Sequence, residues 1–202
     1  MKKNPGMQRN IGGNIKHKNY SVRGWGFSDQ SLKWYKEELN KIKNGTIIEV
    51  GVYGGASLLS IIDICVKNNI TVYGADPWEK TNVVNGVKIA GDDKAFLNKH
   101  MIAARKNLEM IIKNLNYTNI KLIQKKSIET SKQFEDNYFD MVYIDGDHSY
   151  DSVKTDISAW INKVKPGGFL WGDDYKWESV KAAVNEQFTQ IKIINNNWIF
   201  KK

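Results

Sequence analysis

Short apolar runs alternate with longer amphipathic stretches from about residue 46 to the end of the chain. Residues 46–50 form a β-rich run, residues 56–66 have helical spacing, and residues 70–74 read as a second strand. A closing hairpin is predicted from strands at 191–194 and 198–200 around three asparagines. The other predicted elements are a helix over about 92–115, strands at 120–124, 141–144 and 169–172, and helices at 127–134, 150–164 and 178–188.

This order of elements predicts an α/β fold with a doubly wound, Rossmann-like sheet. The strands are mostly apolar rather than alternating, which is typical of parallel strands that are covered by helices on both faces. The closing hairpin makes one edge of the sheet antiparallel. In such sheets ligands bind at the carboxyl ends of the strands, so the informative residues should follow each strand directly.

One domain is expected, because 202 residues are too few for two domains of ordinary size. Residues 1–27 are rich in Lys, Asn and Gly without periodicity, and they are interpreted as an N-terminal arm or lid. The domain proper spans 28–202, and its first helix, over about 32–42, lies outside the sheet. The long polar segment 81–92 is a second candidate lid.

Composition describes a globular chain with a basic surface. Hydrophobic residues make up 41% and the formal net charge is +8. Arginine occurs only at Arg9, Arg23 and Arg105, so the excess is mostly lysine, which favours a Lys-rich surface over a nucleic-acid partner. The single Cys65 fits a reducing compartment and a buried thiol. With no signal peptide and no apolar run of membrane-spanning length, a cytoplasmic protein is expected and no membrane partner.

A glycine-rich turn follows the first strand of the sheet. Gly51, Gly54 and Gly55 allow a tight turn and a close approach of a ligand to the backbone. Their spacing is G-x-x-G-G rather than G-x-G-x-x-G, so no glycine is placed for a pyrophosphate. The turn therefore favours a nucleoside over a dinucleotide.

Polar residues at strand ends complete the predicted cofactor site. Glu49 would suit an amino group of methionine type, Asp76 both ribose hydroxyls and Ser127 the adenine. Asp145, at the end of another strand, is grouped with them. Taken singly, Glu49 could instead cap backbone groups, Asp76 could start a turn and Ser127 could cap a helix. Because the three residues follow three strand ends in register, a shared ligand is favoured over these separate structural roles.

Four carboxylates follow the fourth and fifth strands of the sheet: Asp145, Asp147, Asp173 and Asp174. Because neighbouring strands lie about 5 Å apart, these acids would repel one another unless protons or a cation neutralised them. Oxygen donors without thiolates favour a hard divalent ion, Mg²⁺ before Mn²⁺ or Ca²⁺. Asp147 and Asp173 could instead cap helices. His148 and Asp147 are rival candidates for a general base.

The motifs together resemble class I S-adenosylmethionine-dependent methyltransferases. The resemblance covers about residues 45–202 and is greatest to the subgroup of macrocin O-methyltransferase, which also holds cephalosporin-hydroxylase-like proteins. It is carried by Ile48-Glu49-Val50-Gly51 with Gly54-Gly55, by Ala75-Asp76-Pro77-Trp78, by Tyr143-Ile144-Asp145-Gly146-Asp147-His148-Ser149-Tyr150, and by Lys165-Pro166-Gly167-Gly168 through Gly172-Asp173-Asp174-Tyr175.

The resemblance implies a seven-stranded sheet of order 3-2-1-4-5-7-6 with an antiparallel last strand. It also implies a metal bound by Asp145, Asp173 and Asp174, and a base at Asp147 or His148. The implied reaction is methylation, with S-adenosylmethionine, of a hydroxyl on a small molecule or sugar. The sequence leaves homo-oligomerisation open.

Two other functions are weighed against this one. A nucleic-acid methyltransferase would carry an Asn/Asp-Pro-Pro-aromatic motif after the fourth strand, where this chain has Asp145-Gly146-Asp147-His148. A noncatalytic nucleoside-binding protein of the same fold would have no need of the acidic cluster. Both alternatives are therefore disfavoured.

Overall fold

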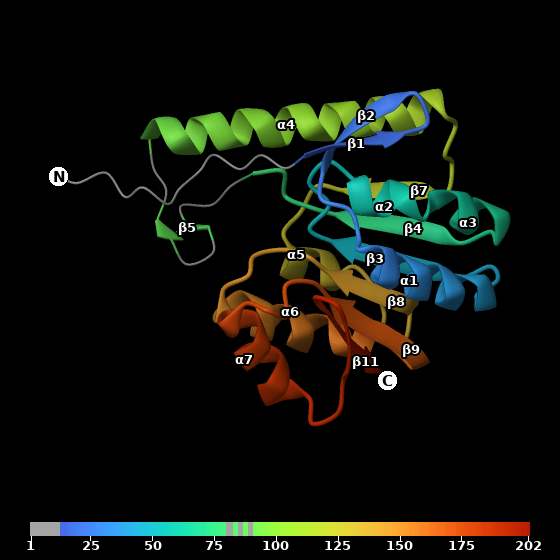
Figure 1. Ribbon diagram of the computed structural model, residues 1–202, viewed down its shortest axis with the longest axis vertical. Helices are drawn as coiled ribbons and strands as arrows, with labels where there is room; N and C mark the ends of the chain where they lie inside the picture. The colour runs from blue at the N-terminus through green and yellow to red at the C-terminus, as the bar shows by residue number, and fades with distance from the viewer. Residues whose placement is uncertain (1–12, 80–82, 85–86, 89–90) are drawn as a thin grey trace.

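The computed structural model describes residues 13–79, 83–84, 87–88 and 91–202 (Figure 1). Seven strands form one sheet in the order β10-β11-β9-β8-β3-β4-β7. β3 pairs in parallel with β4 and β8, whereas β11 runs antiparallel to both β9 and β10. The strands are β3 (Thr46–Val50), β4 (Thr71–Ala75), β7 (Ile120–Ile123), β8 (Phe139–Ile144), β9 (Val164–Gly172), β10 (Lys192–Ile194) and β11 (Asn197–Lys201). Counted from β3, the order reads 3-2-1-4-5-7-6, which confirms the predicted topology.

Helices cover both faces of the sheet. Alternate residues of β3 belong to different cores: Ile47 packs with α1 to α4, and Ile48 packs with α6 and α7. This double burial is why the strands read as continuous apolar runs. The helices are α1 (Asp29–Lys41), α2 (Ala56–Ser60), α3 (Ile62–Lys67), α4 (Gly91–Asn114), α5 (Ser127–Ser131), α6 (Tyr150–Trp160) and α7 (Glu178–Gln187), with a 3₁₀ turn η1 (Ile161–Lys163) after α6.

Two differences from the predicted boundaries have a visible structural cause. The helix expected over 56–66 is broken into α2 and α3 at Ile61, whose N–H bonds to Leu58 and Leu59 and so closes a tighter turn. The glycines expected to separate a helix from the fifth strand lie inside β9. There the pairing with β8 shifts register between Phe139 and Met141, so residues 165–168 form a bulge.

The N-terminal segment contains a β-hairpin that the sequence reading missed. β1 (Gly13–His17) and β2 (Tyr20–Gly24) pair antiparallel, and the hairpin lies along α4 (Figure 1). Asn107 of α4 donates from its amide to the Ser21 carbonyl at 2.9 Å. Residues 1–12 lie outside the described residues, and the role of the segment as a lid stays a prediction.

The second candidate lid, 81–92, is described only in part. Within it, β5 (Val83–Val84) and β6 (Val87–Lys88) pair antiparallel.

Cys65 is buried, and burial raises the pKa of its thiol to about 12, as expected of an unreactive core thiol. Over the described ranges, no helix has both the length and the apolar character needed to cross a membrane.

Candidate functional site

Four neighbouring strands end level with one another at one edge of the sheet. Val50 pairs with Ala75 on one side and with Ile144 on the other, and Ile144 pairs with Gly172. The next residue of each strand therefore falls in one row across the sheet. The row reads Asp76, Gly51, Asp145 and Asp173. The strand ends predicted from the sequence thus come together at this edge.

Gly51 directly follows β3, where the backbone passes close to Asp145 at the end of β8. Its φ is 95°, and a Cβ atom there would lie 2.0 Å from the carbonyl oxygen of Asp145. The Asp145 N–H donates to the Val50 carbonyl at 2.8 Å, so the two backbones are held together. Only glycine tolerates both the positive φ and the close approach of the Asp145 carbonyl oxygen.

Gly54 and Gly55 are crowded by other parts of the chain. A Cβ atom at Gly54 would lie 2.0 Å from the Arg23 carbonyl oxygen, and one at Gly55 would lie 2.7 Å from Leu108. The hairpin and α4 therefore account for the absence of side chains at both positions. Their contact with a cofactor stays a prediction.

Glu49 is a buried carboxyl group at the end of β3. It accepts a hydrogen bond of 2.5 Å from the Ser57 hydroxyl at the start of α2. Burial raises the pKa of Glu49 well above its ordinary value, and the carboxylates of Asp145 and Asp76 add to this, against the Ser57 hydrogen bond. A cation beside Glu49 would restore its charged form.

Asp76 joins the glycine turn to the end of β4. Its Oδ2 accepts from the Tyr53 N–H at 2.9 Å, and its Oδ1 accepts from the Trp78 N–H at 2.6 Å. The second contact is the turn that the alternative reading anticipated. Trp78 is buried and donates from its indole to the Tyr53 carbonyl, so the carboxylate is fixed in orientation.

Ser127 begins α5, but its hydroxyl does not cap that helix, because Lys126 is the N-cap residue. The hydroxyl accepts from the Trp160 indole at 2.8 Å and hydrogen-bonds the buried Asp156 carboxyl of α6. Burial raises the pKa of Asp156 to about 6, with the Ser127 hydrogen bond opposing and Asp147 adding to it. No strand-end motif pointed to Asp156, because it lies two turns into a helix.

Asp145, His148 and Asp174 form a compact group in the loops after β8 and β9. One possible ligand atom from each lies within 4.8 Å of the other two, close enough to share a metal ion. His148 Nε2 lies 3.1 Å from Asp174 Oδ2. Burial raises the pKa of Asp145 well above its ordinary value, and the charges of Asp173 and Asp174 raise it further.

Asp173, the third predicted metal ligand, lies beside this group but outside it. Its Oδ1 accepts from the Asp174 N–H at 2.8 Å and from the Asn197 amide at 3.2 Å. Burial raises the pKa of Asp173 to about 6. The buried Tyr143 hydroxyl lies near both carboxyl groups and opposes the rise in the pKa of Asp145 and of Asp173, a contact that the sequence did not predict.

Asp147, the other candidate base, accepts from the Ser149 N–H at 2.9 Å. The N-cap of α6 is Ser149 and that of α7 is Trp177, so neither Asp147 nor Asp173 caps a helix as the alternative reading supposed. Trp177 is 45% exposed, and its ring centroid lies 5.2 Å from that of His148.

The part of the chain that forms this site is also the part that matches a known protein family. A family model described as a methyltransferase domain matches residues 48–175. An uncharacterized protein of Acanthamoeba polyphaga mimivirus is 28% identical over 156 residues, covering 73% of this chain and 61% of the relative. One of Sinorhizobium fredii is 25% identical over 123 residues, covering 59% of this chain and 12% of the relative. The chain thus spans less than two thirds of either relative.

Solved structures share the fold. The O-methyltransferase NovP superposes with a TM-score of 0.66 at 18% identity, over 86% of this chain and 79% of NovP. A candidate methyltransferase from Streptococcus mutans, solved in complex with SAH, superposes with a TM-score of 0.59 at 13% identity, over 87% of this chain and 99% of that one. At these identities the likeness concerns the fold alone.

Proposed function

The chain belongs to the methyltransferase domain family, and on this premise we propose that it methylates a hydroxyl group of a small molecule with the help of a divalent metal ion. Methyltransferases of this fold use S-adenosylmethionine, which supplies the methyl group. The observation that carries the proposal is the group of Asp145, His148 and Asp174 within 4.8 Å of one another, beside the turn after β3.

We place the cofactor across the row of strand ends. Glu49 is buried, and burial raises its pKa. The amino group of the methionine part of S-adenosylmethionine would stabilise the charged form of this carboxyl group. Asp76, held by two backbone N–H groups, would accept from the ribose hydroxyls. The adenine would lie toward Ser127, whose hydroxyl is held by Trp160 and Asp156.

The acidic group suits a hard divalent ion. Asp145 and Asp174 offer carboxylate oxygens, and Asp173 lies next to them. Burial first, and then the charges of Asp173 and Asp174, raise the pKa of Asp145, and a cation would favour its charged form. We propose Asp145 and Asp174 of this group as ligands of Mg²⁺, with Asp173 beside them as the third ligand, which leaves His148 for proton transfer. When bound, the ion would lower the pKa of an acceptor hydroxyl and so favour its deprotonation.

His148 is our choice for the base that takes the acceptor proton. If Nε2 carries the proton that bonds Asp174, then Nδ1 is the basic atom of the ring. Asp174 would hold the ring in that tautomer and stabilise the imidazolium that forms, while methyl transfer proceeds in line without a covalent enzyme intermediate. Asp147, which accepts from the Ser149 N–H, is the second choice.

Calorimetry with S-adenosylhomocysteine (SAH) and 5′-methylthioadenosine, which lacks the amino-acid part, tests the cofactor placement. Glu49→Gln should weaken SAH binding about tenfold or more and leave methylthioadenosine unchanged, because one charged hydrogen bond is lost. Asp76→Asn should weaken both nucleosides. Equal loss of both ligands in Glu49→Gln would contradict the placement.

Transfer from labelled S-adenosylmethionine to a panel of hydroxylated aromatics and sugars, with Mg²⁺ present, tests the reaction. Methyl incorporation into RNA or DNA instead would favour a nucleic-acid methyltransferase. Binding of SAH without binding of Mn²⁺ or Mg²⁺, and without transfer to any acceptor, would favour a noncatalytic nucleoside-binding protein.

A further inference from the structure

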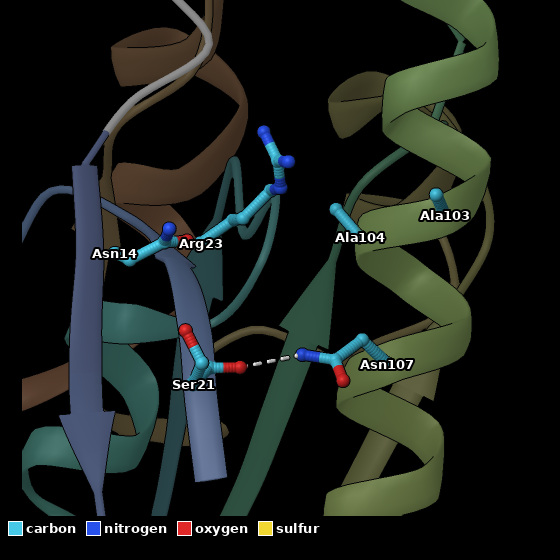
Figure 2. Close-up of a pocket in the computed structure, with 6 residues that line it drawn as sticks. All are labelled: Asn14, Ser21, Arg23, Ala103, Ala104 and Asn107. Carbon is cyan, nitrogen blue, oxygen red and sulfur yellow. Dashed lines mark hydrogen bonds between the residues drawn. The ribbon is translucent and has the colours of Figure 1, made fainter.

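A pocket of about 320 Å³ lies between the N-terminal hairpin and α4. Its volume is at the lower end of the range for small-molecule sites. Figure 2 shows the side chains that line it, with Arg23 extending between β2 and α4. The lining residues are Asn14, Ser21 and Arg23 from the hairpin and Ala103, Ala104 and Asn107 from α4.

Arg23 is the only charged side chain among these six residues. In the part of the chain that the structure describes, no carboxylate forms an ion pair with it. The other described arginine, Arg105, binds the Glu109 carboxylate at 2.8 Å. A guanidinium that lines a pocket without an acidic partner is suited to an anion, which its planar fork binds through two hydrogen bonds.

The surroundings of Arg23 supply further polar groups and space. Asn14 pairs with Arg23 across the hairpin, and the amide of Asn107 donates to the Ser21 carbonyl at the pocket wall. Ala103 and Ala104 present only methyl groups on the α4 side (Figure 2). The pocket thus combines one cation, neutral hydrogen-bonding groups and small side chains.

The pocket adjoins the glycine turn of the proposed cofactor site. The Arg23 carbonyl lies against Gly54, and the guanidinium is near enough to the Tyr53 hydroxyl for its charge to oppose the rise in the Tyr53 pKa that burial causes. The Tyr53 ring in turn lies 6.3 Å, between centroids, from Trp25, which is 58% exposed. Arg23, Tyr53 and Trp25 therefore link the pocket to the outer surface beside the turn.

We propose that the Arg23 pocket binds an anionic group, a carboxylate or a phosphate, of the methyl acceptor. The inference rests on the proposed function, which puts the cofactor on Glu49 and Asp76, and neither of these lines the pocket. A carboxylate is also present in the cofactor itself. The test therefore separates the two sources of the anion.

Arginine-selective isotope labelling gives a direct readout, because the chain has arginine only at positions 9, 23 and 105. Inorganic phosphate titrated into the SAH-saturated protein should shift the Arg23 guanidinium signal to saturation and leave the Arg105 signal in place. Arg23→Lys, which assigns the signal and keeps the charge, should weaken phosphate binding through loss of the fork, and Arg23→Gln should abolish it. Phosphate binding in these variants is followed by backbone amide shifts at Asn14 and Asn107.

A matched control is Lys16→Gln, which removes an exposed cation from the same hairpin and should leave phosphate binding unchanged. Equal shifts of the Arg23 and Arg105 signals, or unchanged phosphate binding in Arg23→Gln, would overturn the proposal. Arg23→Gln should also bind SAH and methylthioadenosine as the parent protein does. A selective loss of SAH affinity would assign Arg23 to the cofactor carboxylate and would overturn the acceptor assignment, while the Glu49 and Asp76 tests of the proposed function would stand.

Discussion

His148 Nε2 lies 3.1 Å from Asp174 Oδ2, so the ring of the first residue is oriented by a carboxylate on the neighbouring strand end. The two residues come from the loops after β8 and β9, which pair in parallel. A general base is commonly oriented by a third group in this way, and Asp174 has that position relative to His148.

Replacing His148 tests its role as base. His148→Gln should lower the rate of methyl transfer about 100-fold or more, because a general base contributes at least about that factor, while Mn²⁺ affinity changes little. Asp147→Asn, a removal of charge in the same loop, is the comparison and should have a smaller effect on rate. A tenfold loss of Mn²⁺ affinity in His148→Gln would make His148 a metal ligand instead, and a larger rate loss in Asp147→Asn would make Asp147 the base.

Gly51 should tolerate no side chain. Gly51→Ala combines a φ of 95° with a Cβ atom 2.0 Å from the Asp145 carbonyl oxygen, and should lower the free energy of unfolding by at least about 3 kcal/mol. Gly167 is the matched control, because its φ is 80° and no atom lies within 4 Å of an added Cβ. Gly167→Ala should lose only about 1 kcal/mol, from backbone strain alone. Urea unfolding would measure both, and equal losses would contradict the close approach of β3 and β8.

Asp156 should make the protein less stable as the pH rises. Its folded pKa of about 6 lies above the ordinary value of 3.8, so the unfolded chain releases this proton first, and stability falls between about pH 4 and pH 6. Above that window the ionised form costs on the order of 3 kcal/mol. Asp156→Asn should therefore flatten the dependence of the unfolding free energy on pH. An unaltered slope in Asp156→Asn would refute the assignment.

The sheet could be predicted from the sequence because its strands are buried on both faces. Ile47 and Ile48 belong to different cores, and that double burial leaves the apolar runs from which the strands were read. The row of Asp76, Gly51, Asp145 and Asp173 follows from the parallel pairing, since each residue comes directly after its strand. Strand order itself came from the family resemblance.

Side-chain partners could not be predicted, because they join residues far apart in the sequence. The hydroxyl of Ser127 accepts a hydrogen bond from Trp160, 33 residues away, and its place beside the adenine stays a prediction. The hairpin was missed although Ile15, Tyr20 and Val22 hint at alternation on either side of Lys18-Asn19. Its contact with Gly54 then explains a glycine that the sequence assigned to the cofactor alone.

Removal of the metal ion tests the central claim most directly. The rate of methyl transfer to an acceptor found in the hydroxyl panel would be measured after treatment with EDTA and again after Mg²⁺ is restored, with Asp145→Ala beside the parent protein. We expect EDTA to lower the parent rate at least about 100-fold, since the ion supplies several kcal/mol of stabilisation, and Mg²⁺ to recover it. Asp145→Ala should gain nothing from Mg²⁺ while still binding SAH. Unchanged turnover in EDTA would contradict a metal-dependent reaction at Asp145, Asp173 and Asp174.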